Sequence, residues 1–227
     1  MPESSVGSIS KAYAVLAKDV RLELRTRYAL NAILMFGITT LAVVSFSLGQ
    51  SGLPPKLLAA LFWIVMFFSA MSGLAQVFVR EEEAGTAMAL RLGADPNPIF
   101  IGKLFFNLGL LTVMSCIVTP MFFILTDAPT ENIIAFLPVL ALGVIGLCAA
   151  TTMIAAIIAR ASVKGALFSV LSFPVLMPLL LILVRATDRI LEGSGIGGIA
   201  SELQFLVAYA VIMVTLSVLL FEFVWQD

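Results

Sequence analysis

Apolar residues along this chain gather into about six long runs that are separated by short polar segments. A helix needs about 20 apolar residues to cross the roughly 30 Å of hydrocarbon in a bilayer, and each run is close to that length. The predicted spans cover residues 30–48, 57–79, 104–125, 133–158, 166–184 and 203–221. The pattern predicts an all-α integral membrane protein, and the short connections predict one transmembrane domain over residues 1–227.

Composition supports lipid as the solvent for most of the chain. Hydrophobic residues make up 61% and charged residues 12%, whereas soluble domains are about half apolar and a quarter charged. The net charge of −1 gives no support for a nucleic-acid partner. The chain has no histidine, so it lacks the commonest metal and haem-iron ligand. Cys116 and Cys148 lie inside apolar runs and are expected to be buried free thiols.

The segment 10–29 mixes basic and apolar residues at helical spacing, with Arg21, Glu23 and Arg25 near its centre. The residues of one apolar stripe are Tyr13, Leu16, Val20, Leu24 and Tyr28. This pattern predicts an amphipathic elbow helix that lies among the headgroups of an anionic leaflet. The alternative is a solvated helix with incidental charges.

Lysine and arginine are divided unevenly between the two sides of the predicted spans. Ten lie on the side of the N-terminal helix and of segments 80–103 and 159–165, and three (Lys56, Arg185, Arg189) lie on the other side. Because cytoplasmic loops carry the excess of positive charge, both termini and segment 80–103 are predicted to be cytoplasmic.

Segment 80–103 is the most polar connection and has a helical pattern of its own. Its candidate residues for binding a partner are Glu81, Glu82, Glu83, Gly85, Thr86, Met88, Leu90, Arg91 and Leu92. Thr86 can cap a short helix over residues 87–92, and Gly93 can end it in a left-handed conformation. Asn97 is expected to cap the following helix, with Pro98 at its first position. We interpret this segment as a cytoplasmic coupling helix whose apolar ridge enters a groove on a partner. The alternative is a connector packed on the membrane surface.

The interiors of the spans argue against an ion-coupled carrier. No Asp, Glu, Lys or Arg lies in the central part of a predicted span, although such carriers use buried ionisable groups. Small residues recur at a spacing of four, as in Ser69 with Gly73 and Ala155 with Ala159, which predicts close helix contacts.

Two prolines, Pro174 and Pro178, lie one turn apart in the fifth predicted span. Each removes a backbone donor and clashes with the preceding turn, so a kink or break is expected there. The kink can shape a cavity, or it can be a bend without a gating role.

No nucleotide-binding motif is present. Gly102-Lys103 suggests a P-loop, but Asn97 stands where glycine is required and Leu104 where the magnesium ligand is required. Lys103 is therefore interpreted as an interfacial anchor. The chain is not expected to be an enzyme, and any ATP and magnesium would be bound by a separate subunit.

Several segments together resemble the CcmB-type haem exporter permeases of cytochrome c maturation, within the type-2 ABC transporter permeases. They are the elbow 20–25, the acidic run 81–83 followed by Gly85, Thr86 and Leu90, Lys103 at the third span, and 173–179 with its two prolines. The resemblance covers nearly the whole chain.

The resemblance implies a permease pair in the bacterial inner membrane, bound to a cytoplasmic ABC ATPase through segment 80–103. It also implies a haem-handling membrane subunit and a periplasmic haem chaperone as partners. ATP hydrolysis would drive release of the loaded chaperone, with haem held by another subunit and no cofactor bound here. Two alternatives stay open: a type-2 exporter of a lipid or other hydrophobic substrate, and a membrane scaffold that transports nothing.

Overall fold

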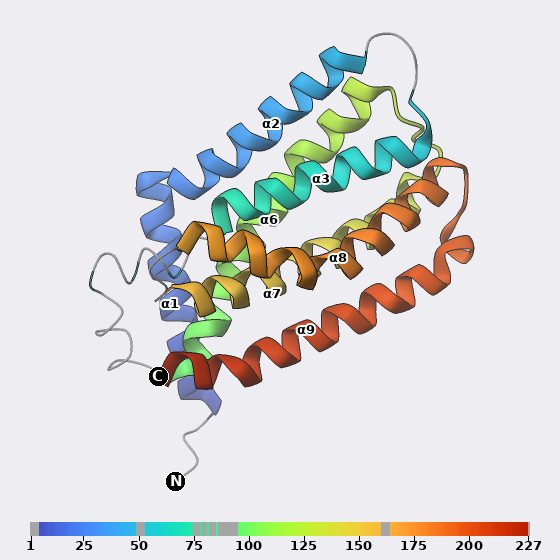
Figure 1. The fold of residues 1–227 in the computed structure, drawn as a ribbon. Helices are drawn as coiled ribbons and strands as arrows, with labels where there is room; N and C mark the ends of the chain where they lie inside the picture. Colours follow the sequence, from blue (N-terminus) through green and yellow to red (C-terminus); the bar gives the residue numbers. More distant parts are fainter. Residues whose placement is uncertain are drawn as a thin grey trace.

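The computed structural model describes residues 5–48, 53–74, 78, 81, 85, 95–159 and 164–226. Within these ranges the backbone is helical apart from turns and short connections, and it contains no strand. The helices are α1 (Ser5–Thr26), α2 (Tyr28–Leu48), α3 (Pro55–Leu74), α6 (Pro96–Thr126), α7 (Ile133–Ile158), α8 (Lys164–Leu191), η1 (Ile196–Ile199) and α9 (Ala200–Gln226) (Figure 1). The all-α prediction is confirmed.

Six helices, α2, α3 and α6 to α9, are long and apolar enough to cross a membrane, as predicted. They run side by side, and the chain reverses direction between successive spans (Figure 1). Helix α1, the last turn of α3, the first turn of α6 and the end of α9 therefore lie at one end of the bundle, which we call the terminal end. The last turns of α2, α6 and α8 lie at the opposite end.

Several helix boundaries differ from those predicted, and the start of α6 and the end of α8 differ most in consequence. Helix α6 begins at Pro96 after the N-cap residue Asp95, before the predicted cap at Asn97. Proline is favoured in the first turn because its missing N–H has no partner there, so the first of the two prolines can start the helix. Helix α8 continues to Leu191, past the predicted end at residue 184, and therefore includes Arg185 and Arg189.

Aromatic side chains fill the centre of the bundle. The Phe62 ring packs edge-on against Trp63, Phe122 and Phe136, with ring centroids 5.1–5.4 Å apart. Trp63 Nε1 donates a hydrogen bond of 2.9 Å to Thr187 Oγ1, which joins α3 to α8. Edge-to-face geometry and a satisfied indole N–H are what a buried aromatic cluster requires. The cluster fixes α3 against α6, α7 and α8.

Small residues allow close approach of α2 and α3. A Cβ added at Gly73 would lie 2.0 Å from Ile33 Cγ1, and one at Gly37 would lie 3.2 Å from Ser69 Oγ. The predicted pair Ser69 and Gly73 thus lies at a helix contact, as expected for small residues in membrane bundles. Ala155 and Ala159 are also buried, within a second apolar cluster near the terminal end.

Helix α8 is continuous through Pro174 and Pro178, so the chain is not broken there. Figure 1 shows its ribbon changing direction along its length. The carbonyl of Val175, between the two prolines, accepts a hydrogen bond of 2.9 Å from Tyr209 Oη on α9. This hydrogen bond joins α8 to α9 between the two prolines. The role of the prolines in shaping a cavity stays a prediction.

Both cysteines are free, as predicted, but only Cys148 is buried. Its thiol donates to the carbonyl of Leu104 at 3.5 Å. Cys116 is exposed, so the prediction that it is buried is wrong. An apolar run indicates lipid or protein surroundings alike, and Cys116 lies on a face of α6 that the described helices leave uncovered.

We expect Gly143→Ala to destabilise the bundle by about 1–3 kcal/mol, because overpacking a rigid site has that cost. An added Cβ would lie 2.3 Å from Trp63 Cη2, and the indole is held by its hydrogen bond. The matched control is Gly109→Ala, where nothing lies within 4 Å of the added atom. Thermal unfolding in detergent measures both, and equal stability of the two variants would contradict the packing described here.

Candidate functional site

The structure describes part of the predicted coupling segment. Glu81 is helical and buried, and Gly85 has a φ of +68° with nothing within 4 Å of an added Cβ. The other candidates lie outside the described residues: Glu82, Glu83, Thr86, Met88, Leu90, Arg91 and Leu92. A left-handed turn lies at Gly85. The predicted helix over 87–92 and its left-handed end at Gly93 lie outside the described residues and stay predictions.

Lys103 is the centre of a buried charge cluster at the terminal end. Its side chain is 1% exposed, and Nζ lies 3.2 Å from both Asp19 Oδ2 and Glu81 Oε1. The ammonium also lies over the Phe78 ring, 5.3 Å from its centroid. A buried ammonium must be compensated by close partners, and here they come from α1 and from the start of the coupling segment. The prediction that Lys103 is a simple interfacial anchor is wrong, because α1 covers it.

Lys18 extends the cluster toward the solvent. Its ammonium forms ion pairs with Glu81 and, at 3.3 Å, with Asp19 Oδ1. Burial lowers the pKa of Lys18, but the hydrogen bond to Glu81 and the charges of both carboxylates outweigh it, so the net pKa is raised. The cluster thus brings two cations and two carboxylates into contact.

Helix α1 also contacts the other end of the coupling segment. Lys11 Nζ lies 3.0 Å from Asp95 Oδ2, the residue just before α6. Lys11 and Lys18 are two helical turns apart, so they share one face of α1. The helix thus contacts the coupling segment at two points, at Glu81 near its start and at Asp95 just before α6.

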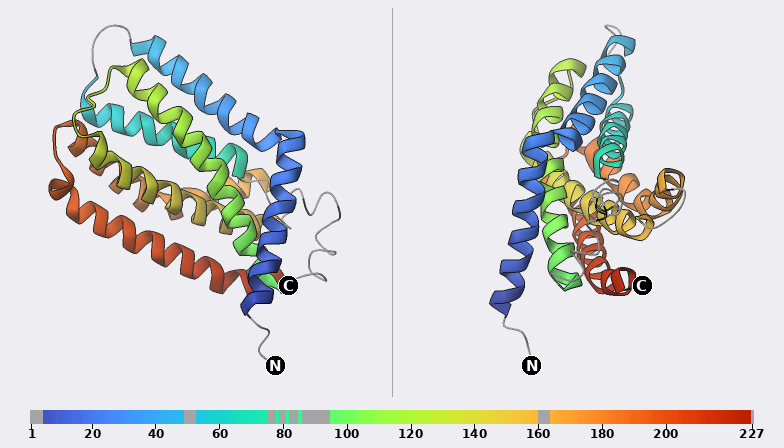
Figure 2. Two further views of the ribbon diagram at one scale, coloured as in Figure 1. Left: turned by 180° about the vertical axis from the view of Figure 1, so that it is seen from behind. Right: turned by 90° about the vertical axis from the view of Figure 1, so that its left-hand side faces the viewer.

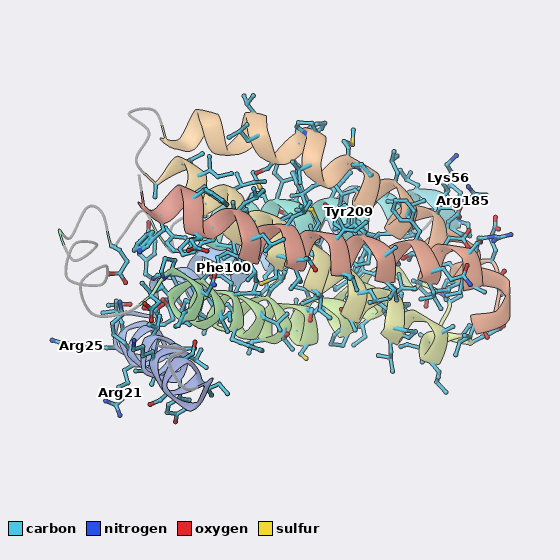
Figure 3. The ribbon with its side chains drawn as sticks, turned by 90° about the horizontal axis from the view of Figure 1, so that it is seen from below. Arg21, Arg25, Lys56, Phe100, Arg185 and Tyr209 are labelled. Atoms are coloured by element: carbon cyan, nitrogen blue, oxygen red, sulfur yellow. The ribbon has the colours of Figure 1, made fainter. Side chains whose placement is uncertain are left out.

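The predicted elbow residues divide between two faces of α1. Glu23 is 6% exposed, and its Oε1 accepts a 2.8 Å hydrogen bond from the backbone N–H of Leu30, in the first turn of α2. Arg21 and Arg25 are exposed and point away from the bundle (Figure 3). Glu23 therefore caps the first span, while the arginines face the surroundings.

Sequence analysis missed Asp19, which belongs to the cluster. A usable signal was present: Val15, Asp19 and Glu23 recur every four residues and so share one helix face. All three are buried against the bundle. Two carboxylates in line with an apolar residue indicate acids that face protein partners rather than water.

Close packing holds α1 in this position. A Cβ added at Gly102 of α6 would lie 2.7 Å from the carbonyl oxygen of Ala12 and 2.8 Å from Val15 Cβ. The backbones of the two helices therefore touch beside Lys103. The absence of a side chain at this position is what permits the contact.

Aromatic rings join the cluster to α9. Phe221 packs against Phe78 and Phe100 at centroid distances of 5.4 and 5.0 Å, and it stacks on Trp225 at 5.4 Å. Phe78 in turn lies under Lys103. The last turns of α9 thus pack against Phe78, which lies next to Lys103.

The chain matches the CcmB protein family over residues 10–224, nearly its whole length. It belongs to the CcmB family. A comparison with individual curated proteins gave no significant match. The family is one of ABC transporter permeases of haem transport and cytochrome c biogenesis, and its members are not themselves catalytic enzymes. The resemblance deduced from the elbow, the acidic run and the proline-bearing span is confirmed.

The charged cluster of Lys18, Asp19, Glu81 and Lys103 links three parts of this CcmB-family chain, and we call it the joint. Its cations and carboxylates contact one another across α1, α6 and the start of the coupling segment. Among the described residues, no group of three or more His, Cys, Asp or Glu is placed to hold a metal ion. Such ion pairs fix the relative positions of helices. The arrangement is therefore suited to a structural role.

We expect Lys103→Met to destabilise the protein by about 3–5 kcal/mol, because it leaves buried carboxylates without their cation. Lys11→Met removes an ion pair whose side chains are 36% and 54% exposed and should cost about 0–1 kcal/mol. Thermal unfolding in detergent gives both values. Adding Asp19→Asn and Glu81→Gln to Lys103→Met should restore part of the loss. A Lys103→Met protein as stable as the Lys11→Met control would show that the cluster does not hold the helices.

Proposed function

We propose that this CcmB-family chain is the membrane subunit through which a separate cytoplasmic ATPase drives haem handling in cytochrome c maturation. The observation that supports the proposal best is the buried cluster around Lys103. It ties Glu81, at the start of the polar segment 80–103, to α1 and α6. A segment that a partner moves must be joined firmly to the spans if its motion is to reach them.

The contacts define a route for that motion. Displacement of the segment acts on Lys18 and Lys103 through Glu81, and hence on α1 and α6. Glu23 then joins α1 to the first turn of α2. Because helices are rigid over their length, a shift at the terminal end becomes a shift of whole spans. Breaking the buried ion pairs is costly, so the joint moves as a unit.

The partners follow from the family and from the composition of the chain. ATP and magnesium would be held by the ATPase, whose two copies would face two copies of this chain. Haem would be held by a haem-handling membrane subunit and a periplasmic chaperone, since the chain offers no histidine as axial ligand. ATP hydrolysis would then release the loaded chaperone from the complex.

We place the terminal end in the cytoplasm of a bacterial inner membrane. Ten of the thirteen lysines and arginines belong to segments on that side, and excess positive charge marks the cytoplasmic side. A cytoplasmic terminal end puts segment 80–103 where an ATPase can reach it, which makes the orientation and the proposed coupling mutually consistent.

Cysteine labelling tests this orientation. In a chain with Cys116 and Cys148 replaced, cysteines at Asp127 and Gly195 should react with an impermeant maleimide added outside intact cells. A cysteine at Ala84 should react only after the cells are opened, because the segment that contains it is cytoplasmic. Labelling at Ala84 from outside would overturn the orientation and the proposed coupling with it.

Substitutions in the coupling segment test the function. Met88→Ala with Leu92→Ala removes the predicted apolar anchors, a change that costs about 2–5 kcal/mol per residue when such side chains are fully buried. It should reduce both co-purification of the ATPase and cytochrome c maturation. Glu82→Ala alone should have little effect, because an exposed ion pair contributes about 0–1 kcal/mol.

Gly85→Val should also reduce co-purification of the ATPase and cytochrome c maturation, because it changes the backbone conformation of the segment. The φ of +68° at Gly85 is strained for a branched side chain, and nothing within 4 Å of the added Cβ would clash. The matched control is Gly197→Val, which also meets open space but has no positive φ. Full ATPase binding and full maturation in both the Met88/Leu92 and the Gly85 variants would reduce the segment to a connector or a scaffold element.

A further inference from the structure

Charge is sorted between the two faces of α1. Both of its carboxylates, Asp19 and Glu23, are 6% exposed and face the bundle. Its two lysines form ion pairs with residues at either side of the coupling segment. Arg21 and Arg25 are exposed, and neither has an ion-pair partner in the described part of the chain. The outward surface of the helix therefore carries positive charge without compensating negative charge.

An apolar stripe lies beside the arginines. Tyr13, Val20 and Leu24 are 70%, 38% and 69% exposed, and their spacing of seven and four places them on one line. Arg21 directly follows Val20, and Arg25 directly follows Leu24. Each arginine therefore lies about 100° around the helix from the stripe. Exposed apolar side chains flanked by cations are typical of helices embedded at the boundary between headgroups and acyl chains.

The position of α1 agrees with such a location. The helix crosses the ends of the spans rather than running alongside them (Figure 2). It ends at Thr26 and α2 begins at Tyr28, so the chain turns from one direction to the other at Arg27, which has a φ of 50°. A sharp turn between a crossing helix and a spanning helix puts α1 at the level where the hydrocarbon ends.

The joint at Lys103 keeps this face pointing outward. Asp19 is held by Lys103 on one side of α1, and Gly102 leaves no space between the two helices. Rotation of α1 about its axis would break the buried ion pair and move Val15 out of the core. The arginines and the apolar stripe therefore occupy fixed positions relative to the membrane.

We propose that the outward face of α1 is a binding surface for anionic phospholipid headgroups, with Arg21 and Arg25 as the binding groups. A guanidinium matches a phosphate with two parallel hydrogen bonds. Zwitterionic headgroups carry the same phosphate but neutralise it with their own cation, so an anionic lipid is preferred. Tyr13, Val20 and Leu24 enter the boundary with the acyl chains. This surface goes beyond the proposed function and does not depend on the ATPase.

Local fluorescence quenching tests the surface in the full chain. A bimane fluorophore is attached at Ala17→Cys, one turn before Arg21, with Cys116→Ser present and the buried Cys148 left in place. The protein is reconstituted in vesicles of phosphatidylcholine and phosphatidylglycerol in equal parts. In each sample one of the two lipids carries a nitroxide near the headgroup. The ratio of quenching by the two labelled lipids gives the local preference at α1.

Each cation near an anionic surface contributes about a fivefold preference. We expect several-fold stronger quenching by labelled phosphatidylglycerol, a ratio near one in Arg21→Gln with Arg25→Gln, and a retained preference in Arg21→Lys with Arg25→Lys. Lys56→Gln, at the opposite end of the bundle, is the matched control and should leave the ratio unchanged. Circular dichroism confirms that the variants keep their helix content.

Three results would overturn the proposal. A ratio near one in the parent chain, or one that the double glutamine variant leaves unchanged, would show that the arginines do not select anionic lipid. Absence of quenching by either lipid, in the chain alone and in the complex with its ATPase, would show that protein rather than lipid covers this face of α1.

Discussion

A lysine buried beneath an amphipathic helix is the constraint on which the terminal end of this protein depends. Lys103 is 1% exposed, and transferring a lone ammonium into such surroundings is prohibitive without close negative partners. Asp19 and Glu81 supply them from elements that are distant in the sequence. Where Lys103 lies therefore determines where α1 can lie and where the coupling segment leaves the bundle.

The two ends of the bundle are held by different means. At its centre, edge-to-face aromatic rings around Phe62 and small residues such as Gly73 set the distances between spans by close packing. At the terminal end, ion pairs and hydrogen bonds set the register of α1 against α6 and α2. The centre and the terminal end of the bundle thus depend on different interactions, and the position of α1 depends on the buried ion pairs.

The spans could be predicted from sequence because runs of apolar residues report directly on lipid or protein surroundings. Their ends were harder to predict: α8 continues past residue 184 to Leu191, and its Arg185 and Arg189 form ion pairs with Glu202 on α9. The cluster around Lys103 was not predicted, because Lys103 and Asp19 are 84 residues apart in the sequence and meet only when α1 packs against α6. The positive φ at Gly85 was not predicted, because the sequence analysis placed the left-handed turn at Gly93, which lies outside the described residues. Burial of Cys116 was predicted wrongly, since hydropathy does not separate lipid-facing from protein-facing positions.

An ion-pair joint beneath the coupling segment has a cost that an apolar one would not have. Replacing a buried ion pair by well-packed hydrophobic residues is often neutral or stabilising, so the cluster is weak evidence for stability alone. Its distinctive property is structural specificity, because only an arrangement that places carboxylates next to Lys103 satisfies the buried charge. Asp19 fixes the rotation of α1, and Glu81 fixes the residue at which segment 80–103 begins. The same rotation turns Arg21 and Arg25 outward. One buried cation thus defines both the surface that we assign to lipid and the segment that we assign to the ATPase.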